Sequence, residues 1–523
     1  MSRTPSPAWH KEERLLLTFA RNVSTRYLAI AVAALIGLLV LPFNVRHLGT
    51  SAYGLWMLTA SITTYFTVME LGYGGAVVRF VAEYRAKRDA QSLNEILSTL
   101  FFVFTAMGIG CYLLAVGVAA LMPAIFNLAP DQVHTGRMIL LIVAANVTMM
   151  FIFSVFGGVV NGFQRYYLNN VIGTATEVLS AAVNVAVLLA GYGLVELVAA
   201  VTLVRMAPYY LYRRNAHLVF PDLDLSWRHF RKQRLREVTG FSIYLAIINW
   251  SSRLNYAVDS FTIGIFLNTA AVGVYAIALR LSEALFRMTH QLQVFLFPTV
   301  VHRAVEGRTA DQRRLLVQAT RFQIAIAAAL CASTFADAEV LIATWVGPHV
   351  AESARITQIL AVVVVLRACM AMPGTLLKGT GRHRYVAKVS AASAVANVLL
   401  SVVLVQWIGL IGVALGTLIP ATAIAFFAIF PAACAEVELP VLEGLRRIVW
   451  PALWPALLVV LALEWTRPLV PLRLVAVLAH MAMGALTYAA VFVAWGLDRE
   501  ERGWLGARLA ELWRRRAQVL AAA

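Results

Sequence analysis

The sequence predicts an all-α integral membrane protein with about fourteen transmembrane helices. Hydrophobic residues make up 60% of the 523 positions and charged residues only 14%, whereas a soluble globular protein carries about 25% charged residues. The mean hydropathy is +0.75. Apolar runs of about twenty residues, the length that crosses a bilayer as a helix, recur along the whole chain.

These runs divide the chain into successive regions. We expect a cytoplasmic N-terminal segment (1–23), an N-lobe of six helices (24–213), a cytoplasmic amphipathic linker (214–237), a C-lobe of six helices (238–433), a last pair of helices (434–497) and a basic cytoplasmic tail (498–523). In the linker, Ser226 followed by Trp227 and Phe230 predicts a capped amphipathic helix. The expected membrane spans are 24–46, 52–72, 96–121, 137–161, 167–191, 194–213, 238–266, 270–297, 315–336, 356–377, 384–406, 410–433, 447–464 and 472–496.

The distribution of positive charge predicts the orientation of these spans. Of the 44 Lys and Arg residues, 32 fall in segments on one side of the membrane, 5 on the other and 7 within the runs. Segments rich in Lys and Arg stay in the cytoplasm, so both termini are expected there. Topology thus accounts for most of the net charge of +17, and no nucleic-acid partner is expected. The basic linker and tail are expected to lie on anionic membrane lipid.

The chain also carries an internal repeat. Leu48–Trp56 and Leu267–Tyr275 share Leu, Thr, Ala and Gly at a constant offset of 219. Ordered matches at similar offsets indicate a duplicated six-helix unit, and an even number of spans makes the two copies parallel around a central cavity. The other matching pairs are Gly157 with Gly374, Gly162 with Gly379, Arg165 with Arg382, and Asn184 with Asn397.

Charged residues interrupt the apolar stretch 245–298. A charge at the centre of a bilayer costs about 2.5–3.5 kcal/mol on insertion scales, so a group of them indicates a function. On an α-helix three of them, Arg280, Glu283 and Arg287, share one face with His290. Two interpretations stay open: ion pairing around Glu283, or a cationic cavity in which these residues and Arg253 bind an anionic diphosphate.

The first half of the repeat contains hydroxyls where the second half contains charges. Ser61 and Thr64 stand opposite Arg280 and Glu283 at the offset of 219. We expect these hydroxyls to line a path for sugar, and Arg26 to capture the headgroup or to reach the membrane surface as an ordinary interfacial Arg.

Several function classes lack a signature. The sequence contains no nucleotide-binding loop, zinc pattern or nucleophile motif, so neither an enzyme nor a cofactor is expected. The four cysteines lie in or at the edge of apolar runs without a C-x-x-C pair, which indicates small core residues. They are Cys111, Cys331, Cys369 and Cys434.

Several motifs in this order resemble the polysaccharide flippase family of the multidrug/oligosaccharidyl-lipid/polysaccharide exporter superfamily, over residues 25 to 430. The motifs are Leu48-Gly-x-x-x-Tyr-Gly-Leu-Trp, Glu70-Leu-Gly-Tyr-Gly-Gly-Ala-x-x-Arg-x-x-Ala-Glu-Tyr, Asp259-x-x-x-Ile-Gly, Val272-Gly-Val-Tyr and Lys378-Gly-Thr-Gly-Arg. The resemblance implies a flippase that moves undecaprenyl-diphosphate-linked oligosaccharide across the bacterial inner membrane by alternating access. O-antigen, capsule or exopolysaccharide would be the product, and a polysaccharide polymerase is a possible partner. The alternatives are a lipid II flippase and a cation-coupled multidrug exporter of the same superfamily.

The resemblance to the lipid II flippase branch also implies a coupling-ion site for Na⁺ or H⁺. The similar positions here are Asp259, Asn397, Ser401, Val413 (through its carbonyl) and Thr417. Ser401 stands where that branch has a second carboxylate, so the identity of the ion stays open. The alternative is that Asp259 binds no ion and is a buried carboxylate satisfied by neighbouring amides.

Overall fold

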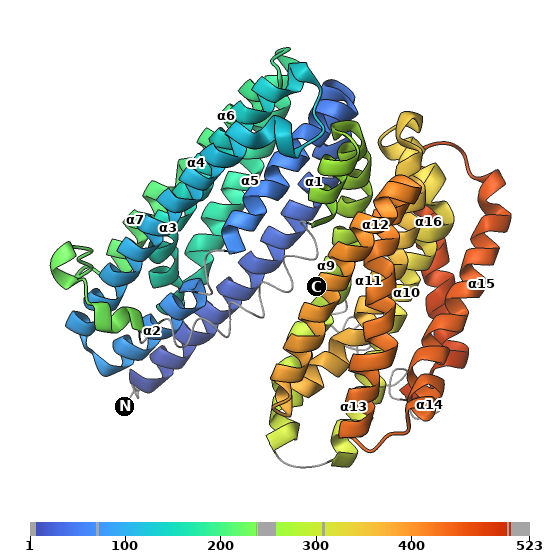
Figure 1. Ribbon diagram of the computed structural model, residues 1–523. Coiled ribbons are helices and arrows are strands. Elements are labelled where there is room, and N and C mark those ends of the chain that lie inside the picture. The colour runs from blue at the N-terminus through green and yellow to red at the C-terminus, as the bar shows by residue number, and fades with distance from the viewer. Residues whose placement is uncertain are drawn as a thin grey trace, which may run out of the picture. The chain divides into compact units, whose positions relative to one another are not determined.

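The computed structural model describes residues 7–68, 73–236, 238, 258–305, 309–498 and 501–503, and these residues form helices joined by short connections. The chain divides into two compact units (Figure 1): residues 1–277 with 401–413, and residues 278–400 with 414–523. The helices are α1 (Pro7–Val68), α2 (Tyr73–Lys87), α3 (Ala90–Ile125), α4 (Pro130–Gly162), α5 (Tyr166–Leu189), α6 (Leu194–Met206), α7 (Pro208–Val219), α9 (Thr269–Val305), α10 (Thr309–Trp345), α11 (Glu352–Gly379), α12 (His383–Ile424), α13 (Phe430–Glu436), α14 (Val441–Gly444), α15 (Trp450–Thr466) and α16 (Leu474–Val491). Short 3₁₀ segments lie at η1 (Trp227–His229), η2 (Pro348–Val350) and η5 (Arg467–Leu469), and π-helical segments at η3 (Ala425–Ile429), η4 (Leu445–Val449) and η6 (Phe492–Gly496).

The chain is a multi-pass membrane protein. Among the described residues, 11 helices are long and apolar enough to cross a membrane. Two of them each contain two of the expected runs, because α1 is broken at Gly49 and α12 at Ile408 and Gly409, where the backbone leaves helical φ and ψ. Most of the expected span 238–266 lies outside the described residues.

The helix boundaries repeat as the sequence does. The matching glycines Gly162 and Gly379 are the last residues of α4 and α11. The next helices begin directly after the matching residues Arg165 and Arg382, which occupy the N-cap positions of α5 and α12. Equivalent residues of the two sequence copies therefore end and begin equivalent helices.

In the first unit, α3 and α4 run side by side (Figure 1). Helix α2 packs closely on α4, because Gly158 and Gly162 have no side chain where Val77 and Val81 lie. Small residues at this spacing let two helix backbones approach each other. The spacing Gly158-x-x-x-Gly162 therefore has a packing function.

The amphipathic helix predicted for the linker is wrong over residues 220–231. Between the end of α7 and the helical residues 232–236 the chain has no α-helix, only turns and one 3₁₀ turn at Trp227–His229, and the Ser226 side chain makes no capping hydrogen bond. Side chains of α3 hold the segment instead: the Asn94 amide donates to the Asp222 carbonyl at 2.7 Å and accepts from the Asp224 amide at 3.2 Å. These bonds satisfy backbone groups that a helix would have paired internally.

In the second unit, α10 packs against α11, α15 and α16 (Figure 1). Its core includes Leu316, Met372, Phe430 and Leu463. All four cysteines of the chain are buried free thiols, as the sequence predicts.

Candidate functional site

The predicted substrate residues are distributed over both units. Arg26, Ser61 and Thr64 belong to the first unit, whereas Arg280, Glu283 and Arg287 belong to the second. Arg253 and the side chain of His290 lie outside the part of the chain that is described.

The charged stripe of α9 is an ion-pair cluster around one carboxylate. Arg280 Nη1 lies 3.6 Å from Glu283 Oε2, and Arg287 Nη2 lies 3.3 Å from the same oxygen. The arginine side chains are 49% and 54% exposed, whereas Glu283 is 29% exposed. Their spacing of three and four residues places them one turn on either side of Glu283. Of the two interpretations left open by the sequence, the ion pairing is therefore present.

The three charged residues of this cluster sum to one positive charge. Two guanidinium groups together carry ten N–H donors and two positive charges, whereas Glu283 supplies one negative charge. Both arginine side chains remain about half exposed in the presence of these ion pairs. The cluster is thus a pre-oriented pair of forked donors of the kind that binds phosphate oxygens.

The hydroxyls of α1 bond to their own helix. Ser61 Oγ donates to the Leu58 carbonyl at 2.8 Å, and Thr64 Oγ1 donates to the Ala60 carbonyl at 2.9 Å. With the proton used in this way, each hydroxyl oxygen can only accept further hydrogen bonds. Thr64 is exposed and Ser61 half-buried, and Arg26 is exposed near the start of the first apolar run.

Asp259 is buried and hydrogen-bonded. Its side chain is 2% exposed, and the Tyr275 hydroxyl donates to Asp259 Oδ2 at 2.6 Å. Sequence reasoning did not identify Tyr275 as the partner, although Tyr275 closes the Val272-Gly-Val-Tyr motif. A short bond of this type stabilises the ionised carboxylate inside the protein.

The other four predicted ion ligands form two pairs along α12. Thr417 Oγ1 donates to Asn397 Oδ1 at 3.4 Å, and Ser401 Oγ donates to the Val413 carbonyl at 3.4 Å. The break at Ile408 and Gly409 separates the members of each pair along the chain. Each of these four residues would bind an ion through a neutral oxygen atom. The described residues contain no group of three or more His, Cys, Asp or Glu able to hold a metal ion.

The two copies of the repeated motif touch each other within the first unit. A Cβ added to Gly54 would overlap the Thr269 carbonyl oxygen, and a Cβ added to Gly273 would overlap the Thr50 carbonyl oxygen. Thr50 and Gly54 match Thr269 and Gly273 at the offset of 219, so the contact is reciprocal. Reciprocal contacts of this kind are produced by a local two-fold axis. The side chains of Ser51, Gln132 and Thr269 surround it with mutual hydrogen bonds of 2.6 to 2.9 Å.

Comparison with known proteins adds a family to this geometry. A family model described as "Polysaccharide biosynthesis protein" matches residues 19–302, more than half of the chain. "Probable flippase AglR" of Haloferax volcanii is 20% identical over 410 residues, 77% of this chain and 81% of that protein. "Uncharacterized membrane protein EpsK" of Bacillus subtilis is 23% identical over 269 residues, 50% of this chain and 52% of that protein, so the match spans about half the length of EpsK.

Solved structures share the fold. The lipid II flippase MurJ in an inward closed conformation gives a TM-score of 0.69 at 12% identity, over 90% of this chain and 97% of that chain. An inward-facing multidrug resistance transporter of the MATE family, a member of the MOP superfamily, gives 0.65 at 15% identity, over 78% and 94%. The family and transporter names of these proteins agree with the expectation that the chain is not an enzyme. The chain belongs to the polysaccharide biosynthesis protein family and has the fold of MOP-superfamily transporters.

Proposed function

We propose that the protein is a flippase that translocates an undecaprenyl-diphosphate-linked oligosaccharide across the bacterial inner membrane. The product would enter O-antigen, capsule or exopolysaccharide synthesis. Membership of the polysaccharide biosynthesis family supports the product class, and the name of the relative AglR supports flipping as the activity.

The observation that carries the proposal is the arginine pair of α9. Arg280 and Arg287 share the Glu283 carboxylate and remain about half exposed. A diphosphate carries at least two negative charges on oxygens that match guanidinium geometry. Glu283 then holds the arginines in position until the diphosphate arrives, with Arg253 and His290 as further ligands and Ser61, Thr64 and Arg26 serving the sugar and the headgroup.

The transport cycle proposed is alternating access by two lobes. In this proposal residues 24–213 make up the N-lobe and 238–433 the C-lobe, each of six helices, and the helices within 434–497 are an additional pair. Matching helix boundaries at Gly162 and Gly379 support the duplication. The Lys and Arg distribution supports cytoplasmic termini, with anionic lipid as the surface partner and a polysaccharide polymerase as a functional one.

A coupling ion at Asp259 is the second part of the proposal. One buried carboxylate together with neutral oxygens can bind Na⁺, because hard cations prefer oxygen ligands. The same carboxylate can instead carry a proton. Asn397, Ser401, Thr417 and the Val413 carbonyl are the other ligands proposed. Thr417 bonds to Asn397 and Ser401 bonds to the Val413 carbonyl, each at 3.4 Å, so the members of each pair lie close together.

Two alternatives differ in substrate. Lipid II also has a diphosphate, so the α9 arginines fit it equally well. A cation-coupled multidrug exporter needs acidic residues for cationic drugs, and the surplus positive charge on α9 opposes that function.

The test is transport by purified, full-length protein in liposomes containing a polyprenyl-diphosphate-linked fluorescent oligosaccharide. We expect Arg280→Ala/Arg287→Ala to flip the lipid at least about 10-fold more slowly, since even one lost charge-assisted hydrogen bond contributes about 1.5–3 kcal/mol. Arg205→Ala is the matched control, because Arg205 is 48% exposed and lies 3.8 Å from Glu177 on a neighbouring helix.

A wild-type rate for the double variant at normal membrane levels would contradict the proposal. Mass spectrometry of lipid that co-purifies with the wild-type protein then identifies the glycan. A lipid II headgroup in that sample would favour the first alternative.

A further inference from the structure

The second unit contains a pocket of about 510 Å³ that the proposed transport path does not use. Four arginines line it: Arg313, Arg314, Arg321 and Arg447. No motif of the sequence indicates this pocket, because its residues come from three segments that lie far apart along the chain.

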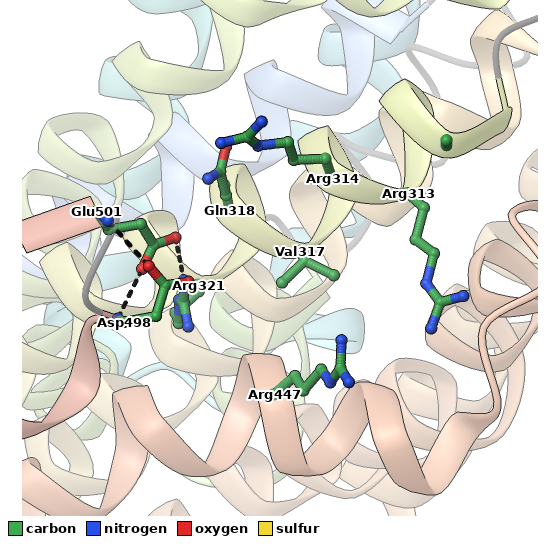
Figure 2. Close-up of a pocket in the computed structure, with 9 residues that line it drawn as sticks. Arg313, Arg314, Val317, Gln318, Arg321, Arg447, Asp498 and Glu501 are labelled. Atoms are coloured by element: carbon green, nitrogen blue, oxygen red, sulfur yellow. Dashed lines mark hydrogen bonds and ion pairs between the residues drawn. The ribbon is translucent and has the colours of Figure 1, made fainter. Parts of the chain in front are cut away.

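One wall of the pocket is the first part of α10. Arg313 and Arg314 are followed one turn later by Val317 and Gln318, and two turns later by Arg321, so these side chains share one face of the helix. Val317 packs against the hydrophobic core and forms an apolar floor. Figure 2 shows Arg447 approaching this face from another helical segment, η4.

A single carboxylate orients two of the arginines. Glu443 Oε1 accepts from Arg313 Nη2 at 3.0 Å, and Arg447 Nη2 lies 2.9 Å from the same oxygen. Glu443 therefore brings the two guanidinium groups together but neutralises only one of them. Their side chains remain 37% and 62% exposed.

The acidic residues on the other side of the pocket are already engaged (Figure 2). Asp498 and Glu501 form a capping box, in which each side chain accepts from the other residue's backbone amide, at 2.9 and 3.1 Å. Glu501 also accepts from Arg321, whose side chain is 8% exposed. Arg321 Nε is buried and has no hydrogen-bond partner among the described residues.

The pocket lies where three membrane-length helices have an end. These are the start of Ala310–Trp345, the start of Val441–Leu469 and the end of Leu474–Gly496. The distribution of Lys and Arg predicts that all three ends are cytoplasmic. Anionic lipid headgroups concentrate at that surface, and basic pockets between transmembrane helices bind them.

We propose that this pocket binds a phosphate group, held by Arg313, Arg314 and Arg447. Among the described residues, the lining arginines outnumber the lining carboxylates four to two, and Glu443 beside the pocket adds a third carboxylate. A planar guanidinium donates two parallel hydrogen bonds to phosphate oxygens. The phosphate belongs either to the headgroup of an anionic phospholipid or to a free phosphate in the cytoplasm.

The test measures binding of three ligands to purified full-length protein in detergent: phosphatidylglycerol, phosphatidylcholine with the same acyl chains, and inorganic phosphate. We expect Arg447→Gln and Arg314→Gln each to weaken binding about fivefold, because one Arg near an anionic headgroup contributes about that factor. Gln318→Glu places a carboxylate in the same pocket without removing an arginine, and it should weaken binding at least as much.

Arg446→Gln is the matched control, since Arg446 is the exposed neighbour of Arg447 and does not line the pocket. Binding is compared only among variants whose melting temperature equals that of the wild-type protein. If Arg447→Gln fails to fold, Arg314→Gln and Gln318→Glu decide the question, because neither removes an arginine that is paired with Glu443.

Each outcome has one meaning. Preference for phosphatidylglycerol without competition by inorganic phosphate identifies a lipid headgroup, whereas binding of inorganic phosphate that the same variants weaken identifies a free phosphate. Equal binding of both lipids together with no binding of phosphate overturns the proposal. So does an equal loss in Arg446→Gln and Arg447→Gln, which would reflect general surface charge.

Discussion

Gly54 and Gly273 occupy equivalent positions of the sequence repeat, and each lies against the backbone of the other's helix. A side chain on Gly54 would come within 2.7 Å of the Gly273 nitrogen, as well as overlapping the Thr269 carbonyl. Backbone atoms cannot relieve such an overlap by a change of rotamer, as the end of a flexible side chain can. The absence of a Cβ at these two positions is therefore what allows the two motifs to meet.

Gly54→Ala should destabilise the protein. We expect a loss of about 1–3 kcal/mol from overpacking, seen as a lower melting temperature of the purified protein. Gly110→Ala in α3 is the control, because a Cβ there meets no atom within 4 Å. That change should be neutral or stabilising by up to about 1 kcal/mol from helix propensity. Equal melting temperatures for the two variants would contradict the close contact.

Asp259→Asn should abolish the dependence of flipping on an ion gradient, since the amide can neither hold a proton nor attract Na⁺ as strongly. Tyr275→Phe should shift the apparent affinity for the ion about tenfold, because it removes the 2.6 Å hydrogen bond to the carboxylate. Tyr488→Phe is the control, a buried tyrosine that bonds to the Ala452 carbonyl instead. The measurement is liposome flipping under imposed Na⁺ and pH gradients. Unchanged gradient dependence in Asp259→Asn would rule out Asp259 as the coupling residue.

His480→Ala should destabilise the second unit, because His480 joins α16 to α10 through a buried carboxylate. His480 Nδ1 lies 2.9 Å from Asp337 Oδ2, and both side chains are at most 4% exposed. The other ring nitrogen, His480 Nε2, lies 2.8 Å from the Thr466 hydroxyl, so both nitrogens of the buried ring are hydrogen-bonded. Removing one partner of a buried ion pair lowers the free energy of unfolding by about 3–5 kcal/mol. Replacing both partners by apolar residues restores most of that stability.

Thermal unfolding of His480→Ala and of Asp337→Leu/His480→Leu checks this prediction. The double variant should melt at a higher temperature than the single one. The opposite order would show that the pair does not behave as a buried ion pair.

Asn94→Ala should release the linker from α3. The Asn94 side-chain amide makes hydrogen bonds to two backbone groups of the linker, at Asp222 and Asp224. Without these two bonds the segment opens more often and its amide hydrogens exchange faster. Hydrogen exchange of residues 220–231 should become faster, while the rest of α3 stays protected. Gln91→Ala, an exposed change in the same helix, serves as the control. Faster exchange in both variants would point to fraying of α3 instead.

The sequence alone predicted features that depend on short separations along the chain or on the bilayer. Bilayer thickness sets the length of an apolar run, so the membrane helices follow from hydropathy. Even the breaks at Gly49 and Gly409 fall between expected runs. The helical repeat likewise determines that Arg280 and Arg287 reach Glu283, and the motifs of the repeat, in their order, identified the family.

Tertiary structure decided the contacts between distant segments. The Asp259–Tyr275 bond, the reciprocal Gly54 and Gly273 contact, and the arginine pocket have no periodic signal in the sequence, because each depends on how helices pack. The linker illustrates the same limit: its amphipathic pattern predicted a helix, but Asn94, more than a hundred residues earlier, bonds its backbone in a non-helical form. Local patterns report what a segment can form by itself, whereas the partner that satisfies its polar groups is supplied by the folded chain.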